Sequence, residues 1–176
     1  MENQTIAFIP ELTKQVEIGN KTMTRRLTGL EKVNISPDDF RFDGVDEKDA
    51  NIYYFEELKV GEPTESYIIA RSKYKVGEIV NIESTDKKMQ ITGIRAERLQ
   101  KISQTDAKSS GINFKEIYSS RIKLKYYYDY IKNTFIPPSS GRISANYSFQ
   151  TLWRSIYGDN SWIANPWVWV YQFKIV

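Results

Sequence analysis

The 176-residue sequence contains neither cysteine nor histidine, and each absence removes whole classes of function. Without cysteine, the chain cannot form disulfides, thiolate metal sites or a thiol nucleophile. Without histidine, it cannot form a Ser-His-Asp triad or an imidazole zinc site, and it lacks the usual general base near neutral pH. Any catalysis must use Lys, Arg, Tyr, Ser, Thr or carboxylate side chains. We expect no cofactor and no metal, because the acidic residues are not spaced as in an oxygen-ligand loop.

Long hydrophobic runs are also missing. No stretch approaches the ~20 consecutive apolar residues that a membrane-spanning helix requires. The first residues, MENQTIAFIPEL, lack the basic region followed by an apolar core that marks a secretory leader. The sequence therefore predicts a cytoplasmic protein without a membrane partner.

Charge is unevenly distributed along the chain, although the net charge is only +3. The segment Thr28–Glu65 contains eleven acidic and four basic residues, whereas the rest of the chain contains 21 basic and eleven acidic residues. A body this basic attracts phosphates, and an acidic insertion can screen part of it or mimic a competing polyanion. The simpler interpretation, which we favour, is that residues 28–65 form a solvated, variable loop.

The pattern of apolar residues indicates one mixed domain over residues 1–176. Alternating and continuous apolar runs predict strands, and apolar residues at helical spacing predict helices. The predicted strands are Thr5–Ile9, Ser66–Ala70, Ile79–Glu83 and Trp167–Val176, and the predicted helices are Pro10–Gly19, a short one after Ser103, Phe114–Asn133 and one around Phe149–Tyr157. Met89–Leu99 suits either state. Together these elements favour the α+β class: a small β-barrel of about five strands with three or four short surrounding helices.

A strongly basic short segment is Lys21-Thr22-Met23-Thr24-Arg25-Arg26. Three cations and two hydroxyls within six residues can supply phosphate contacts together with directional donors. An exposed basic edge strand would show the same alternation without any ligand. The residues alone leave both interpretations open.

Four blocks, in order along the chain, carry a resemblance to a known family. They are Gly19–Arg26, Tyr74–Glu78, Arg98–Ala107 and the tail formed by Leu152–Gly158 and Trp162–Val168. In these blocks the chain resembles the ASCH domain of the PUA-like superfamily, and more specifically its phage-type members. Thr28–Glu65 and Asn113–Asn146 lie outside the resemblance. The likeness implies a PUA-like barrel, a protein encoded by a phage or other mobile element, and a cleft beside Lys21–Arg26 for RNA or a modified nucleoside.

The resemblance also implies candidate site residues. The binding set is Lys21, Thr22, Thr24, Arg25, Arg26 and Ser110, and our own analysis of the aromatic residues adds Trp162 as a cleft wall. Some relatives deacylate acetylated cytidine, which would make Lys21 and Thr24 catalytic here. Their catalytic glutamate falls at Ser110, so this chain lacks the carboxylate that would orient the pair or shuttle a proton. Glu83 and Glu97 are the carboxylates that neighbouring strands can bring to the cleft.

A second basic surface runs from Arg121 to Tyr130, where lysines interleave with tyrosines. Such a segment can clamp phosphates while its rings stack on unpaired bases. We favour the alternative that the tyrosines extend the core stripe of a helix. Three functions therefore stay open: an RNA- or nucleoside-binding domain, which leads; an amidohydrolase acting on an acylated nucleoside; and a protein-interaction module that uses residues 28–65.

Overall fold

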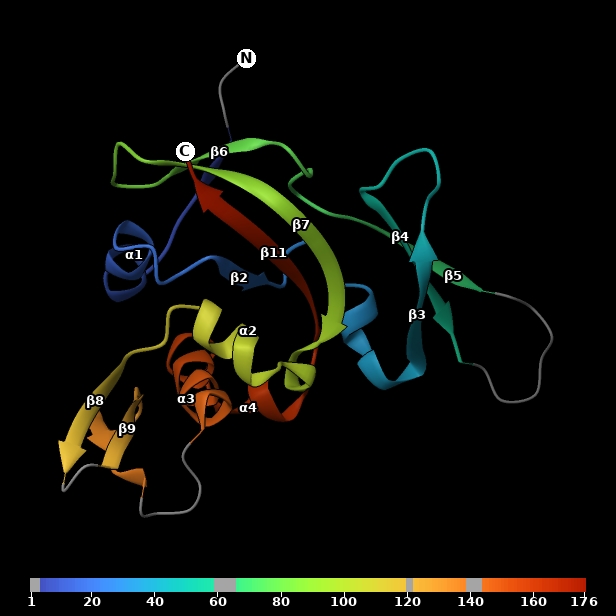
Figure 1. The fold of residues 1–176 in the computed structure, drawn as a ribbon. Helices are drawn as coiled ribbons and strands as arrows, with labels where there is room; N and C mark the ends of the chain where they lie inside the picture. Colours follow the sequence, from blue (N-terminus) through green and yellow to red (C-terminus); the bar gives the residue numbers. More distant parts are fainter. Residues whose placement is uncertain (1–3, 59–65, 120–121, 139–143) are drawn as a thin grey trace. The chain divides into compact units, whose positions relative to one another are not determined.

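A computed structural model of the chain describes residues 4–58, 66–119, 122–138 and 144–176. The chain divides into two compact units, each assembled from segments that are distant in sequence (Figure 1). Unit 1 comprises Met1–Ala7, Thr24–Leu99 and Ala164–Val176, and unit 2 comprises Phe8–Met23 and Gln100–Ile163.

Unit 1 is built on a five-stranded sheet with the order β1-β6-β7-β11-β2. Its strands are β1 (Thr5–Ile6), β2 (Met23–Arg26), β6 (Ile79–Ile82), β7 (Lys88–Arg98) and β11 (Trp167–Ile175). β1 pairs with β6 in parallel, whereas β6 with β7 and β7 with β11 are antiparallel. The predicted final strand is confirmed, and the ambiguous Met89–Leu99 segment is the long strand β7.

β11 is an interior strand of this sheet, between β7 and β2, and both of its faces are apolar. Trp167, Val168, Trp169, Val170 and Tyr171 are consecutive and all buried. Such a two-sided apolar run is typical of a strand that is covered on both faces. β11 therefore carries a large share of the core of unit 1.

A second sheet in unit 1 corrects the prediction for the acidic segment. It has the order β3 (Phe40–Val45), β4 (Ile52–Glu57) and β5 (Tyr67–Arg71), and two short 3-10 turns precede it at Val33–Ile35 and Pro37–Asp39. Alternation along β4 turns Tyr53 and Phe55 inward, where their rings meet Trp169 at 4.6 Å and Trp167 at 5.1 Å between centroids. The solvated-loop interpretation is thus wrong for residues 28–58; residues 59–65 lie outside the described ranges.

Unit 2 contains the helices. They are α1 (Pro10–Glu17), α2 (Gln104–Ser109), α3 (Ala145–Tyr157) and α4 (Asp159–Ile163). The short helix predicted after Ser103 is confirmed as α2, and Ser103 is its N-cap: Ser103 Oγ accepts a hydrogen bond from the Asp106 amide at 3.0 Å. Gly158 follows α3 with φ of 83°, as expected for a glycine that ends a helix.

The helix predicted at Phe114–Asn133 is wrong. This segment forms a three-stranded antiparallel sheet of β8 (Phe114–Ser119), β9 (Ile122–Asp129) and β10 (Thr134–Ile136). The helical prediction relied on a few apolar residues at helical spacing, whereas the whole segment contains five tyrosines and three isoleucines, residue types that favour strands. Arg121, the first residue of the basic surface, lies outside the described ranges.

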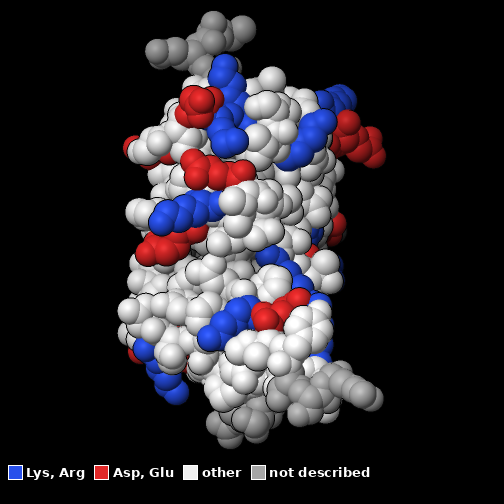
Figure 2. Space-filling model, turned by 60° about the vertical axis from the view of Figure 1, so that its left-hand side comes forward, with Lys and Arg blue, Asp and Glu red and all other residues white. Residues whose placement is uncertain are grey.

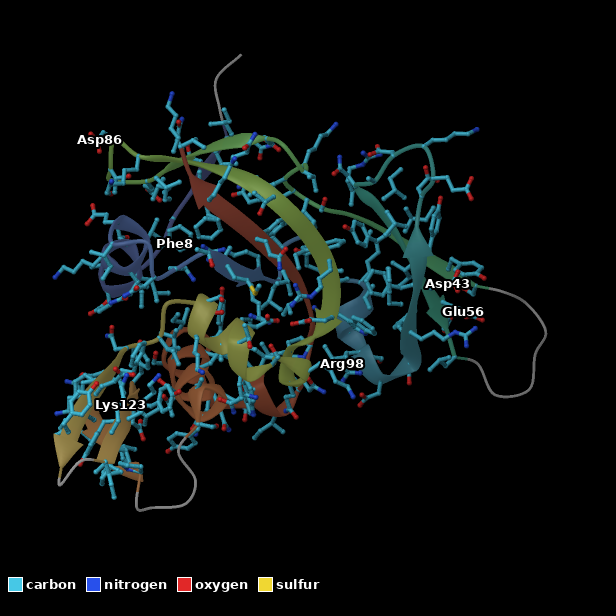
Figure 3. The ribbon with its side chains drawn as sticks, viewed as in Figure 1. Phe8, Asp43, Glu56, Asp86, Arg98 and Lys123 are labelled. Atoms are coloured by element: carbon cyan, nitrogen blue, oxygen red, sulfur yellow. The ribbon has the colours of Figure 1, made fainter. Side chains whose placement is uncertain are left out.

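The fold is therefore mixed α+β, with more strands than the five expected. Eleven strands and four α-helices lie in the described residues, and none of the three sheets there closes on itself. Arg98 shows how loops are fixed to unit 1: its guanidinium donates to Asn165 O, to Pro37 O and to Asp38 (Figure 3). None of the described helices combines the length and the hydropathy needed to cross a bilayer.

We predict that Phe55→Ala lowers the free energy of unfolding by about 3–5 kcal/mol, because it opens a cavity beneath Trp167. Ile69→Ala, on neighbouring β5, is the control because Ile69 is 64% exposed; it should cost under about 1 kcal/mol. Urea denaturation followed by tryptophan fluorescence measures both. Equal, small effects would show that β4 is not part of the core.

Candidate functional site

Lys21 occupies a buried position in unit 2, after the turn that ends α1. The amides of Asn20 and Lys21 both donate to Gln15 O, and Lys21 forms an isolated bridge with Ser110. Its ammonium donates to Met23 O and to Ser110 O, each at 2.8 Å, and lies 5.2 Å from the centre of the Phe8 ring. The structure thus brings together Lys21 and Ser110, two of the predicted site residues.

Gly111 allows the backbone around Ser110 to lie close to Lys21. A Cβ on Gly111 would lie 2.8 Å from Lys21 Cβ and 3.1 Å from Gln15 Cβ, and its φ of 83° is one that side chains rarely adopt. Thr22, exposed beside it, donates its amide to Ser109 O at 2.9 Å. The backbone around Ser110 and Gly111 therefore packs directly on Lys21.

The contacts of Lys21 fit a structural cation better than a general base. Carbonyl oxygens stabilise the charged ammonium, which cannot accept a proton from a threonine. The Ser110 hydroxyl donates to Asp106 O at 2.8 Å, so it serves the end of α2. No carboxylate stands at this position, as the sequence already indicated.

Thr24 and Arg25 belong to unit 1, where both are buried on the edge strand β2. The Arg25 guanidinium lies 2.6 Å from Glu97 Oε1, and Arg95 lies 3.0 Å from Glu97 Oε2. Glu97 therefore holds two arginines of unit 1 together. β2 is an edge strand as one interpretation predicted, but Met23, Thr24 and Arg25 are not exposed.

Arg26 reaches a pocket of about 380 Å³ in unit 1. The pocket lies where the two edge strands of the five-stranded sheet approach each other, since Arg26 Nη2 at the end of β2 donates to Ala7 O, next to β1, at 2.5 Å. Its lining residues are Thr5, Ile6, Ala7, Arg26, Thr28, Lys73, Tyr74, Glu83 and Tyr171. Two cations, one carboxylate and two tyrosine rings thus face one space.

The floor of the pocket is rigid. Tyr74 and Tyr171 are buried, and their rings meet edge to face at 5.1 Å. Tyr74 Oη donates to Thr5 O at 3.1 Å, and Tyr171 Oη accepts from the Lys73 amide at 3.2 Å. Burial raises the pKa of the Tyr171 hydroxyl far above its usual range, against the lowering effect of that amide. The hydroxyl is therefore neutral at every physiological pH.

Lys73, Glu83 and Thr28 are exposed and form the rim of the same pocket. The Lys73 ammonium lies 5.1 Å from the centre of the Tyr74 ring. Sequence reasoning named Glu83 as a carboxylate near the cleft but missed Lys73 and Tyr171 altogether. Arg26, in the predicted binding set, and Tyr74, within the Tyr74–Glu78 block, also line this pocket.

Trp162, predicted as a cleft wall, lies on α4 in unit 2. Its ring packs against Phe149 of α3 with 6.5 Å between centroids, and its carbonyl accepts from Gln100 Nε2 at 2.8 Å. Trp162 is half-buried. Its observed contacts are thus with helix α3 and with the segment before α2.

Comparison with models of known families, with curated proteins and with solved structures finds no match. Within the ranges that the structure describes, no group of three or more carboxylates is placed to hold a metal ion.

Gly111→Ala tests whether the backbone beside Ser110 must lie against Lys21. Gly19→Ala is the matched control: Gly19 also has positive φ, at 78°, but nothing lies within 4 Å of its missing Cβ. We expect the control to cost roughly 1–2 kcal/mol of stability from backbone strain alone. Gly111→Ala should cost at least about 1 kcal/mol more, because Lys21 must move. Equal losses in thermal or urea unfolding would contradict the close packing.

Proposed function

We propose that the chain is an RNA- or nucleoside-binding protein of the ASCH type, and that the Arg26 pocket in unit 1 receives the ligand. The observation that carries this proposal is the set of side chains around the pocket. Arg26 and Lys73 supply positive charge, Glu83 supplies an acceptor, and Tyr74 and Tyr171 supply an aromatic floor. In this proposal the five-stranded sheet is the counterpart of the PUA-like barrel, opened between β1 and β2.

The size and chemistry of the pocket suit one nucleotide. A volume of about 380 Å³ lies within the roughly 300–1,000 Å³ typical of small-molecule sites. Arginine and lysine are the usual partners of phosphate, and arginine can bind it through two parallel hydrogen bonds. A glutamate at the rim can accept a hydrogen bond from an amino group of a base. Phosphate and base can therefore each find a partner in the pocket.

Charge outside the acidic segment supports the same ligand class. The residues other than Thr28–Glu65 carry 21 basic and eleven acidic side chains, which attract a polyanion at long range. Within the acidic segment, arginine already pairs with part of the negative charge: Arg41 bonds Glu56, and Arg71 outside it bonds Asp49 at 2.7 Å. These pairs, and the core residues of β4, favour a structural role for the segment over the protein-interaction alternative.

The amidohydrolase alternative receives no comparable support. It needs a base that can take the proton of Thr24, and Lys21 donates to two carbonyl oxygens. It also needs a carboxylate near the pair, and Ser110 stands in that place. The binding proposal, in contrast, requires only that the pocket residues contact the ligand.

Lys73→Gln should weaken binding of a short fluorescein-labelled single-stranded RNA by about three- to tenfold at low salt. It should also reduce the slope of log K against log salt by about 0.7, the value for one phosphate contact on a single strand. Fluorescence anisotropy over a salt series measures both quantities. Lys174→Gln is the control, because Lys174 is exposed on β11 and outside the pocket.

Two results would contradict the proposal. One is the absence of any binding by the unaltered chain to single-stranded RNA and to the common nucleoside 5′-monophosphates. The other is an equal loss of RNA affinity for Lys73→Gln and Lys174→Gln, which would mean that binding depends only on the net charge of the protein and not on the pocket.

A further inference from the structure

The β8–β9–β10 sheet of unit 2 carries lysines directly beside aromatic rings. In the register of the sheet, Phe114, Glu116 and Tyr118 of β8 lie opposite Tyr127, Lys125 and Lys123 of β9. Because side chains alternate between faces, these residues share one face of the sheet. We call Phe114, Glu116, Tyr118, Lys123 and Lys125 the ring–lysine face; Lys123 is labelled in Figure 3.

Two cation–ring pairs flank one carboxylate on this face. Lys125 Nζ lies 4.5 Å from the centre of the Phe114 ring, and Lys123 Nζ lies 5.9 Å from that of Tyr118. Glu116 binds both lysines, at 2.6 Å to Lys123 and 3.2 Å to Lys125. The hydrogen bond from Lys123 is the main reason why the pKa of Glu116 lies below its usual range. One carboxylate therefore pairs with two cations, and the cluster keeps one net positive charge.

The rings of the ring–lysine face are open to solvent. Tyr118 is 73% exposed and Phe114 is 43% exposed. Tyr118 lies four positions after Phe114, which is about 13 Å along β8. Helix α3 contacts the C-terminal end of β9, beside the buried Tyr127 that lies opposite Phe114: Ser148 Oγ donates to Tyr128 O and Tyr147 Oη donates to Asp129. In the lower part of Figure 2, blue and red side chains lie beside one another among white ones.

We infer that the ring–lysine face binds single-stranded RNA, an inference that rests on the proposed function and names a second contact for its ligand. Bases stack on Tyr118 and Phe114, because any base offers a flat face to an aromatic ring. Lys123 and Lys125 leave Glu116 for the neighbouring phosphates. A duplex is not a ligand for this face, since its bases are already stacked within the helix.

Charge complementarity decides the class of partner. β8 and β9 contain three lysines, Lys115, Lys123 and Lys125, against Glu116 and a buried Asp129 that is bound by Tyr147. Lys115, on the opposite face of the sheet, also lies near rings, at 4.6 Å from the centre of the Phe135 ring and 5.5 Å from that of Tyr126. An anionic chain with flat groups matches this combination of cations and rings. Glu116 then acts as an internal competitor that lowers the affinity for RNA.

If Glu116 competes with RNA for the two lysines, two variants should change the affinity for RNA in opposite directions. Glu116→Gln should bind the labelled single-stranded RNA at least about threefold more tightly, because two lysines are released. Tyr118→Ala should bind it at least about fivefold more weakly, because one base loses its stacking partner. Fluorescence anisotropy measures both, and circular dichroism checks that each variant is folded.

Glu56→Gln is the matched control for the charge change. Glu56 also forms a cross-strand ion pair on a three-stranded antiparallel sheet, with Arg41 of β3. Glu56→Gln removes one negative charge, as Glu116→Gln does. We expect its affinity for RNA to stay within about 1.5-fold of the unaltered chain. A gain as large as that of Glu116→Gln would overturn the inference.

Nucleoside monophosphates separate this inference from the proposed function. The Arg26 pocket should bind them, and Tyr118→Ala should leave that binding unchanged. If Lys73→Gln weakens RNA binding while Glu116→Gln and Tyr118→Ala do not alter it, the ring–lysine face is refuted and the pocket stands. Equal tightening of single-stranded and duplex RNA by Glu116→Gln would also refute it, because stacking would have no role.

Discussion

The burial of β11 is the constraint on which unit 1 depends. Trp167 and Trp169 pack against Phe55 and Tyr53 of the second sheet, and Tyr171 forms part of the pocket floor. Among the described residues Trp169 Nε1 has no hydrogen-bond partner, which costs about 1–3 kcal/mol. Burying a tryptophan ring removes about 150–250 Å² from water, worth roughly 4–6 kcal/mol, so the apolar gain is larger.

The pocket follows from the same sheet, because a sheet that does not close leaves two edges. β1 and β2 are those edges, and Arg26 joins them by its hydrogen bond to Ala7 O. Polar edge groups, two cations and buried rings therefore meet at one place. A site of this composition can hold a charged, flat ligand, whereas Lys21 and Arg25 are engaged in contacts that hold the fold.

Sequence reasoning succeeded where a local pattern and its tertiary role coincided. The two-sided apolar run of β11 and the Ser103 cap of α2 are such cases. It failed at Phe114–Asn133, because a few apolar residues at helical spacing were weighted above the strand preference of the whole segment. The sequence did not predict that Lys73 and Tyr171 line one pocket, because they are 98 residues apart and only the tertiary fold brings them together. The sequence also did not indicate that Tyr53 and Phe55 belong to the core, because the segment around them is strongly acidic.

Photo-cross-linking can show whether RNA binds at the Arg26 pocket. A short single-stranded RNA containing 4-thiouridine is cross-linked to the unaltered chain, and the modified peptides are identified by mass spectrometry. We expect cross-links in the peptides that contain Lys73–Tyr74 and Tyr171, with a further set at Tyr118. Cross-links confined to the peptides of β3 and β4, or to neither region, would contradict it.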